Sequence, residues 1–396
     1  MEKLRIIVGG FIGLYPTGGA TWDYLQYPLG LKMLGHDVYY IEDTGQYPIF
    51  QKNEAWDDAT SCIEYLKSIM DRFGMKDKWA YRDVATGKCF GMTEENVIQV
   101  CESADVFFNI SYSTCPRDEY MRIPNRFLID SDPMFTQIQY LLQENSGSGT
   151  SQSWTTRQMV ESHTHLFSFG ENIGSVDCKI PLLNYDWLPT RQPVVLDLWK
   201  SDGETRSFGF TSIMNWSGRK KLVFENEEWG QKDVEFEKFK EMPNHLKEVD
   251  FEVVINRPLN KESLFNLSEF ETLGWKVLDP HAVVPNASDY RTFIFNSVAE
   301  FGIAKETYVK SNSGWFSCRS ACYLAAGKPV VAQETKWSKY IPSGNGLIAF
   351  SDVESAVDAV RIVNANLAYH SDKAKEIAHE YFDSNIVLIK MLEHLN

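Results

Sequence analysis

Short apolar runs alternate along almost the whole chain with stretches in which apolar residues recur at helical spacing. The short runs are typical of buried strands, and the longer stretches of helices that cover a sheet. The runs predict strands at 4–10, 37–42, 105–110, 126–130, 165–169, 208–214, 251–255, 275–278, 300–304, 328–332 and 347–350. Helices are expected at 22–34, 57–73, 94–103, 133–143, 154–162, 232–241, 287–298, 318–326 and over most of 352–394. This alternation predicts parallel sheets covered by helices.

The alternation is interrupted once, between residues 181 and 200, where three prolines occur without any apolar period. Such a segment indicates a linker between domains. A length of 396 residues fits two domains, each large enough to bury a core of its own. The Gly/Ser-rich stretch at 144–153 predicts a loop. We therefore expect two α/β domains with doubly wound sheets, each with its ligands beyond the carboxyl ends of its strands.

The composition of the chain excludes some classes of function. The net charge of −15 argues against a broad nucleic-acid surface, because phosphate binding draws its affinity from clustered Lys and Arg. The chain lacks an apolar run long enough to cross a bilayer and a recognisable secretion signal, and its seven cysteines are scattered. These features predict a cytoplasmic protein without a membrane span. No His or Cys cluster has metal-ligand spacing, so no metal is expected.

The strand predicted at 126–130 ends in two carboxylates, Asp130 and Asp132. The pair has two functional interpretations: ligands for a divalent metal, or one residue that orients the loop beside a second that acts as a catalytic base. A third interpretation is purely structural, with Asp132 as the N-cap of a helix that begins at Pro133.

The richest motif is SNSGWFSCRSACYLAAGKPVV at 311–331. A loop of small residues leads to Ser317, a candidate N-cap, and then to an amphipathic helix. Helix N-termini bind anions such as diphosphates through free N–H groups. Arg319 opposes the dipole in the first turn and therefore needs an anionic partner, either a ligand phosphate or a neighbouring acid.

Two Rossmann-like halves and the stretch SGWFSCRSACYLAAGKPVV resemble glycosyltransferases of the GT-B fold, in particular sparsely characterised bacterial and phage sequences. The resemblance covers essentially the whole chain. It implies two facing doubly wound domains with a cleft between them: an acceptor-binding domain at 1–188 and a nucleotide-sugar-binding domain at 189–365. It also implies a final helix at 366–396 that crosses back to the first domain.

The resemblance implies a donor site in the second domain and a loop that meets acceptor and donor phosphate in the first. The implied donor residues are Asn215, Trp216, Lys305, Ser313, Gly314, Trp315, Phe316, Ser317, Arg319, Gln333 and Glu334. The implied acceptor and phosphate loop consists of Gly18, Gly19, Ala20 and Thr21, with Thr21 as the cap of a helix that starts near Trp22.

The expected reaction moves a hexosyl or pentosyl group from a UDP- or dTDP-linked sugar to an acceptor hydroxyl, without a metal or cofactor and with inversion. Inversion requires a base for the hydroxyl. Asp132 is the first candidate because it follows a first-half strand, and Asp23 and Glu171 come next. The acceptor stays open among natural products, saccharides, proteins and modified DNA bases, and the net charge disfavours DNA.

Two other functions use the same fold: a nucleotide-sugar epimerase, which needs no acceptor, and a non-catalytic binding protein. A dehydrogenase is disfavoured, because GGFIG at 9–13 lacks the G-x-G-x-x-G spacing and its loop to the next helix is too long.

Overall fold

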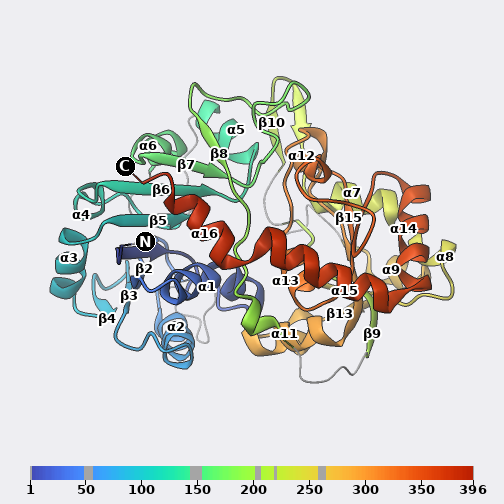
Figure 1. Cartoon of the computed structure of the whole chain (residues 1–396), viewed down its shortest axis with the longest axis horizontal. Helices are drawn as coiled ribbons and strands as arrows, with labels where there is room; N and C mark the ends of the chain where they lie inside the picture. Colours follow the sequence, from blue (N-terminus) through green and yellow to red (C-terminus); the bar gives the residue numbers. More distant parts are fainter. Residues whose placement is uncertain are drawn as a thin grey trace. The chain divides into compact units, whose positions relative to one another are not determined.

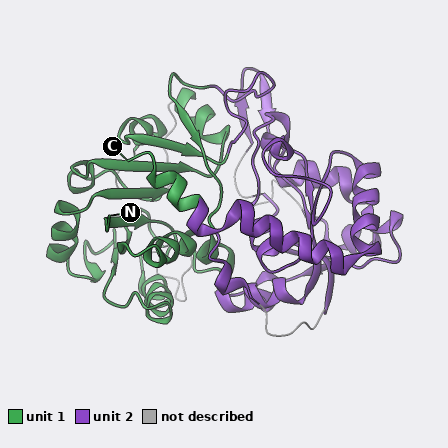
Figure 2. Cartoon of the chain, in the orientation of Figure 1, with its two compact units in different colours: residues 1–169, 182–193, 387–396 green, residues 170–181, 194–386 purple. Residues whose placement is uncertain are grey.

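The computed structural model of the chain describes residues 2–48, 57–142, 154–200, 207–217, 221–256 and 265–395, so the loop predicted at 144–153 lies outside it. The described chain forms two compact units, coloured separately in Figure 2. Unit 1 comprises Met1–Phe169, Leu182–Pro193 and Val387–Asn396, and unit 2 comprises Gly170–Pro181 and Val194–Ile386. The predicted boundaries after residues 188 and 365 differ from this division, because the chain changes unit four times.

Unit 1 is built on one sheet of eight strands in the order β4-β3-β2-β1-β5-β6-β7-β8 (Figure 1). All neighbouring strands are parallel except β3 and β4. The strands are β1 (Arg5–Gly9), β2 (Asp37–Glu42), β3 (Trp79–Arg82), β4 (Cys89–Gly91), β5 (Val106–Ile110), β6 (Asn125–Asp130), β7 (His165–Ser168) and β8 (Trp187–Pro189).

The helices of unit 1 connect these strands. Polar side chains cap the N-termini of several of these helices. Thr155 and Gln158 form a capping box at α6, and Thr93 caps α3. The helices are α1 (Gly18–Met33), α2 (Thr60–Arg72), α3 (Glu94–Glu102), α4 (Asp118–Met121), α5 (Phe135–Leu142) and α6 (Thr156–Glu161), and most of α16 (Ser384–Leu392) belongs to this unit.

Unit 2 has a fully parallel sheet of six strands in the order β13-β12-β9-β14-β15-β16. The strands are β9 (Phe208–Asn215), β12 (Phe251–Asn256), β13 (Trp275–Leu278), β14 (Ser297–Gly302), β15 (Val330–Gln333) and β16 (Leu347–Phe350). A small antiparallel hairpin joins β10 (Leu222–Phe224) to β11 (Glu227–Trp229). Its two turn residues, Glu225 and Asn226, have positive φ, as a tight hairpin requires.

The remaining elements of unit 2 are mostly short helices between the strands. They are η1 (Leu196–Trp199), α7 (Lys232–Phe239), α8 (Met242–His245), α9 (Leu267–Thr272), α10 (Pro280–Val283), α11 (Ala287–Asn296), α12 (Glu306–Lys310), α13 (Cys318–Ala325), η2 (Trp337–Lys339), α14 (Val353–Ala365), α15 (Leu367–Ile377) and η3 (Ala378–Phe382). The last three form the predicted helical tail together with α16. The largest error in a predicted strand of unit 2 is at β14, which runs from Ser297 to Gly302 and not from 300 to 304.

Counted along their parallel strands, the sheets of both units follow the doubly wound order 3-2-1-4-5-6, which unit 1 extends with β8. The predicted α/β class with two doubly wound sheets is confirmed. In such sheets the ligand site lies where the strand order reverses. That point falls between β1 and β5 in unit 1 and between β9 and β14 in unit 2. The predicted cleft between the domains stays a prediction.

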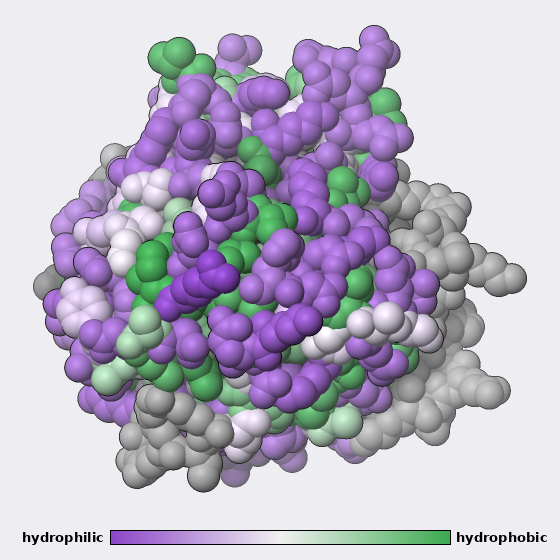
Figure 3. All heavy atoms as spheres, turned by 90° about the vertical axis from the view of Figure 1, so that its right-hand side faces the viewer, coloured by the Kyte–Doolittle hydropathy of each residue, from purple (hydrophilic) through white to green (hydrophobic). Residues whose placement is uncertain are grey.

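Each unit has its own apolar core. In unit 2 it is rich in aromatic side chains, for example Phe236, Phe251, Trp275 and Phe301. Burying side chains of this size contributes about 1.5–3 kcal/mol each. The face of unit 2 seen in Figure 3 is mostly hydrophilic, with apolar residues scattered among polar ones. Among the described residues, no helix combines the length and apolar character of a membrane span.

Candidate functional site

A small pocket opens at the carboxyl ends of β14 and β15 in the unit 2 sheet. Its walls come from the segment after β14, the loop before α13, the first turn of α13, the end of β15, and η2. The atom-free space at the pocket, open solvent included, is about 240 Å³. It is lined by Gly302, Ile303, Ala304, Trp315, Phe316, Ser317, Arg319, Ser320, Ala332, Gln333 and Trp337. Five of the predicted donor residues, Trp315, Phe316, Ser317, Arg319 and Gln333, therefore lie around one hollow.

The N-terminus of α13 forms one wall of this pocket. Ser317 is its N-cap, as predicted, but its side chain makes no capping hydrogen bond. Ala321 is the first residue whose N–H bonds back along the helix, to the carbonyl oxygen of Ser317 at 3.1 Å. The first turn of α13 precedes that bond, and the N–H groups at a helix start favour an anion.

Arg319 is buried in the first turn of α13 and forms an ion pair with Glu300, a fully buried residue of β14. Its Nη1 donates to the carbonyl oxygen of Ile213 at 2.6 Å. Burial alone would lower the pKa of Arg319, but Glu300 more than offsets this, so the pKa lies above its usual value. The anionic partner that the first-turn arginine needs is thus a neighbouring acid. These two contacts occupy two of the five guanidinium N–H groups.

Gln333 ends β15 and holds three segments together. Its Oε1 accepts from the N–H of Ala304 at 3.1 Å, and its Nε2 donates to Glu235 at 2.6 Å. Its carbonyl oxygen accepts from the indole N–H of Trp337 at 3.0 Å. The side chain therefore sets the shape of the pocket wall.

The other predicted donor residues do not line this pocket. Lys305 caps α12, and its Nζ lies 5.1 Å from the ring centre of Tyr308. Tyr308 in turn stacks on Trp315, with 4.3 Å between ring centres. Glu334 accepts from the backbone N–H of Lys336 at 2.5 Å and so closes the turn after β15.

The structure corrects the prediction that Trp216 belongs to the donor site. It is 4 % exposed and packs against Phe236, Phe265 and Phe270 in the unit 2 core. An aromatic ring directly after a strand can turn into the core as readily as into a site. The ring of Trp216 turns into the core. The preceding Asn215 is exposed and accepts from Asn256 on the neighbouring strand at 2.9 Å.

In unit 1, Asp130 is fully buried at the end of β6 and is held by neutral donors. It accepts from Thr136 Oγ1 at 2.7 Å, Ser168 Oγ at 3.0 Å, Gln137 Nε2 at 3.3 Å and the N–H of Asp132 at 3.1 Å. Burial raises the pKa of Asp130 to about 6, although three of these donors lower it. Asp130 thus orients the loop that carries Asp132, as one interpretation of the pair predicts.

Asp132 itself is partly exposed and does not cap a helix that begins at Pro133. Helix α5 starts at Phe135, and Met134 before it has φ +72°. Positive φ also occurs at Ser111 and Tyr112 after β5, and Ser111 Oγ lies 2.6 Å from Ser131 Oγ. Strained non-glycine residues tend to collect at functional sites. The ends of β5 and β6 therefore carry a strained polar cluster around Asp132.

The acceptor and phosphate loop of the prediction is part of a helix. α1 begins at Gly18, because Thr17 accepts the N–H of Ala20 and so caps the helix four residues earlier than expected. Thr21 consequently lies inside α1, where its hydroxyl donates to the carbonyl oxygen of Thr17. Gly19 lies in the same first turn, and Asp23 lies beyond it.

Glu42 is not among the predicted site residues. It is fully buried at the end of β2 and accepts the N–H groups of Gly13 at 2.8 Å and Leu14 at 2.5 Å. Tyr40 donates to it from the same strand at 2.9 Å. Burial raises the pKa of Glu42 to about 7. Glu42 thus fixes the long loop between β1 and α1.

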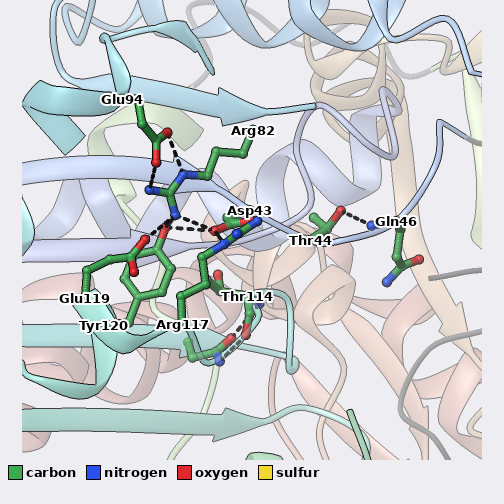
Figure 4. A network of polar contacts seen from close by, with 10 residues as sticks. Asp43, Thr44, Gln46, Arg82, Glu94, Thr114, Arg117, Glu119 and Tyr120 are labelled. Carbon is green, nitrogen blue, oxygen red and sulfur yellow. Dashed lines mark hydrogen bonds and ion pairs between the residues drawn. The ribbon is translucent and has the colours of Figure 1, made fainter. Parts of the chain in front are cut away.

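A second overlooked group is the charged network of Figure 4. Asp43, directly after β2, binds Arg82 Nη1 at 2.8 Å and both Nε and Nη2 of Arg117 at 2.6 and 2.9 Å. Arg82 also pairs with Glu94 and Glu119. The network ties together the segments around β2, β3 and α4, and the wide spacing of its members along the chain hides it from a motif search.

Glu171 belongs to unit 2 and not to the first domain in which it was predicted. The reason is local: the N–H of the next residue, Asn172, donates to the carbonyl oxygen of Ser313 at 3.1 Å. Among the described residues, no group of three or more His, Cys, Asp or Glu side chains is placed to hold a metal ion.

No known family model matches the sequence, and none of the curated proteins matches it. Solved structures do match in three dimensions. An alpha-glucosyltransferase in complex with UDP and DNA containing an HMU base has a TM-score of 0.58 at 11% identity over 99% of both chains. HepE of Anabaena, bound to UDP, has a TM-score of 0.54 at 10% identity over 99% of both chains.

Sucrose-phosphate synthase of Thermosynechococcus elongatus is a further match, with a TM-score of 0.52 at 10% identity over 99% of this chain and 98% of that one. At such identities a likeness establishes the fold and leaves the chemistry open. The agreement extends over nearly the whole length in each case. The chain therefore has the GT-B fold of these glycosyltransferases.

Proposed function

We propose that the protein is a glycosyltransferase that takes its sugar from a nucleoside-diphosphate sugar, with UDP as the carrier. The observation that carries the proposal is the pocket at the carboxyl ends of β14 and β15, walled by the N-terminus of α13 and by Arg319. Two solved structures of the same fold contain UDP, which supports a UDP-sugar in preference to the dTDP-sugar that the sequence leaves equally open.

The pocket supplies what a departing diphosphate needs. First-turn N–H groups and an arginine stabilise negative charge as it develops on the leaving phosphate, and they require no reorganisation when the bond breaks. The ion pair with Glu300 holds Arg319 in place, so the guanidinium would meet the ligand in a fixed orientation. Trp315, stacked on Tyr308, adds a flat surface at the pocket wall.

For the second half of the reaction we propose Asp132 as the base of an inverting, metal-independent transfer. Its N–H donates to Asp130, which fixes its loop, and it remains partly exposed to an incoming hydroxyl. Asp23, within α1, and Glu171, in the segment of unit 2 after β7, are the alternative bases. The acceptor we propose is a hydroxyl group of a small molecule, saccharide or protein. A modified DNA base joins the test panel because one neighbour holds HMU-containing DNA.

A binding experiment tests the donor. Calorimetry with UDP, dTDP, GDP and ADP should give measurable affinity for UDP alone or for UDP and dTDP. The double variant Arg319→Met/Glu300→Gln should weaken that affinity about tenfold or more, because it removes the guanidinium without leaving a buried charge unpaired. Absence of binding to every nucleotide would contradict the proposal and favour a non-catalytic protein.

A transfer experiment tests the reaction. Incubation with a UDP-sugar and a panel of hydroxyl acceptors should release UDP only when an acceptor is present, whereas an epimerase would convert the sugar without one. Asp132→Asn should reduce turnover by about 10²–10⁴-fold, the usual contribution of a general base, with donor affinity unchanged. Activity that is lost on chelation and restored by manganese would instead make Asp130 and Asp132 metal ligands.

A further inference from the structure

The segment from Gly170 to Pro181 leaves the end of β7 and binds the loop at 311–314, inside unit 2. The N–H of Asn172 donates to the carbonyl oxygen of Ser313 at 3.1 Å, and the N–H of Lys179 donates to that of Ser311 at 2.9 Å. This loop leads directly into Trp315, Phe316 and Ser317 of the pocket wall. We call residues 170–181 the arm.

The close approach of arm and loop depends on one glycine. Gly314 has φ +77°, a conformation that other residues rarely adopt, and a Cβ there would lie 2.5 Å from the backbone nitrogen of Asn172. Both the backbone angle and the space therefore require glycine. The resemblance implies that Gly314 is a donor residue, but its geometry serves the contact with the arm.

The side chain of Asn172 is fully buried and uses its whole hydrogen-bonding capacity. Nδ2 donates to the carbonyl oxygen of Asn312 at 2.8 Å and to Asp177 Oδ1 at 3.2 Å. Oδ1 accepts from Tyr340 OH at 2.8 Å and from Lys339 Nζ at 3.2 Å. An amide group offers two donors and two acceptor sites, and all four are occupied.

One of these four bonds stays within the arm, at Asp177, and the other three reach two segments that continue into the pocket wall. Asn312, with φ +53°, belongs to the loop before Trp315, whereas Lys339 ends η2, which contributes Trp337 to the pocket. Lys339 also forms an ion pair with Asp177 of the arm, with Nζ–O distances of 2.7 and 2.8 Å. One buried amide thus fixes the relative positions of Trp315 and Trp337.

We propose that Asn172 is a positioning residue of the donor site: it touches no substrate itself, and it holds the loop at 311–314 and η2 in the arrangement that binds the nucleotide sugar. The expected role in nucleotide-sugar binding rests on the proposed function. The expected role in holding the loop at 311–314 and η2 in place does not depend on the proposed function. A residue that follows a strand of unit 1 in sequence is therefore built into the donor half of the protein.

Two measurements on Asn172→Ala test the proposal. Amide hydrogen exchange should accelerate in 311–317 and 337–340 and stay unchanged in β9 and β12, because only the first two segments are bonded to Asn172. The KM for the nucleotide sugar should rise about tenfold while kcat changes by less than about threefold, since the loss falls on donor positioning and not on the base. Tyr340→Phe, which removes one donor to the same oxygen, should show the same pattern more weakly.

Controls separate this role from general destabilisation. Lys373→Ala breaks an exposed ion pair elsewhere in unit 2 and should alter neither exchange in these segments nor KM. The effects of Asn172→Ala and Tyr340→Phe should be non-additive in the double variant. If Asn172→Ala does not fold, Tyr340→Phe and Lys339→Met carry the test alone.

Unchanged exchange at 311–317 in these variants would overturn the structural claim. Accelerated exchange with an unchanged KM would overturn the donor-site role. If the wild-type protein transfers no sugar, the proposed function fails, while the exchange result still decides whether the arm positions the loop.

Discussion

Asp130 in unit 1 and Glu300 in unit 2 are both fully buried carboxylates on strands that pair in parallel, yet their partners differ in charge. Three side chains and one backbone N–H donate to Asp130, all of them neutral groups. Glu300 faces the guanidinium of Arg319. Asp130 is held by hydrogen bonds from neutral groups and burial raises its pKa to about 6, whereas Glu300 is held in an ion pair with a cation. The first arrangement suits proton chemistry and the second suits a permanent electrostatic site.

The largest effect should come from breaking the charged arrangement. Arg319→Met leaves Glu300 buried without its cation, and removing one partner of a buried pair costs about 3–5 kcal/mol in unfolding free energy. Adding Glu300→Gln should recover most of this loss, because no charge is then left unpaired. Chemical denaturation of both variants checks the prediction. Purely additive losses in the double variant would show that the two residues do not act as a pair.

A smaller, pH-dependent effect is expected for Asp130→Asn. Burial raises the pKa of Asp130 to about 6 in the folded chain, against about 4 in an unfolded one. The folded state therefore holds more protons between these values, and the stability contributed by Asp130 falls as the pH rises from about 4 to about 6.

The variant cannot titrate at this position, so the advantage of the wild-type chain over it should shrink by about 1–3 kcal/mol across this window. Denaturation midpoints of the wild type and the variant, measured at several pH values, test this prediction. An advantage that grows with pH would mean that the neutral donors outweigh the cost of burial.

The smallest effect should come from Ser168→Ala, which removes one neutral donor to Asp130. The expected loss is about 1 kcal/mol, the net value of a single hydrogen bond. Because that bond favours the ionised form, its loss should also move the pKa of Asp130 further upward. A carboxyl NMR titration of wild type and variant reports the shift. A pKa that falls or stays the same would show that Ser168 does not stabilise the carboxylate.

Much of the fold was predictable because parallel strands buried on both faces are short apolar runs. β2, β7 and β16 lie within a residue of their predicted ends. β3, β4 and β8 were missed: they are short and their composition is mixed. The start of α1 was placed late, because the sequence points to Thr21 as the cap while the folded chain uses Thr17.

The candidate site was predictable only where neighbouring residues in the sequence reveal the chemistry of a side chain. A first-turn arginine signals an anionic partner, and the pocket does contain Arg319. That the partner is Glu300 follows from the pairing of β14 with its neighbours, which no local pattern encodes. Trp216 was misassigned and Asn172 was not predicted for the same reason: the sequence does not tell whether an aromatic ring or an amide faces a core, a ligand or a loop.

The division of the chain has a consequence for its synthesis. Unit 1 includes both the first residues of the chain and Val387–Asn396, whose Leu388 and Met391 are buried and whose His394 lies 5.6 Å from the ring of Phe167. On a ribosome, domains usually fold in the order in which they emerge. Here the amino-terminal unit has to wait, with an apolar surface uncovered, until every residue of unit 2 has been made. We therefore expect nascent chains to be most prone to aggregation just before α16 appears, and a fragment ending near residue 188 to be a poor substitute for unit 1.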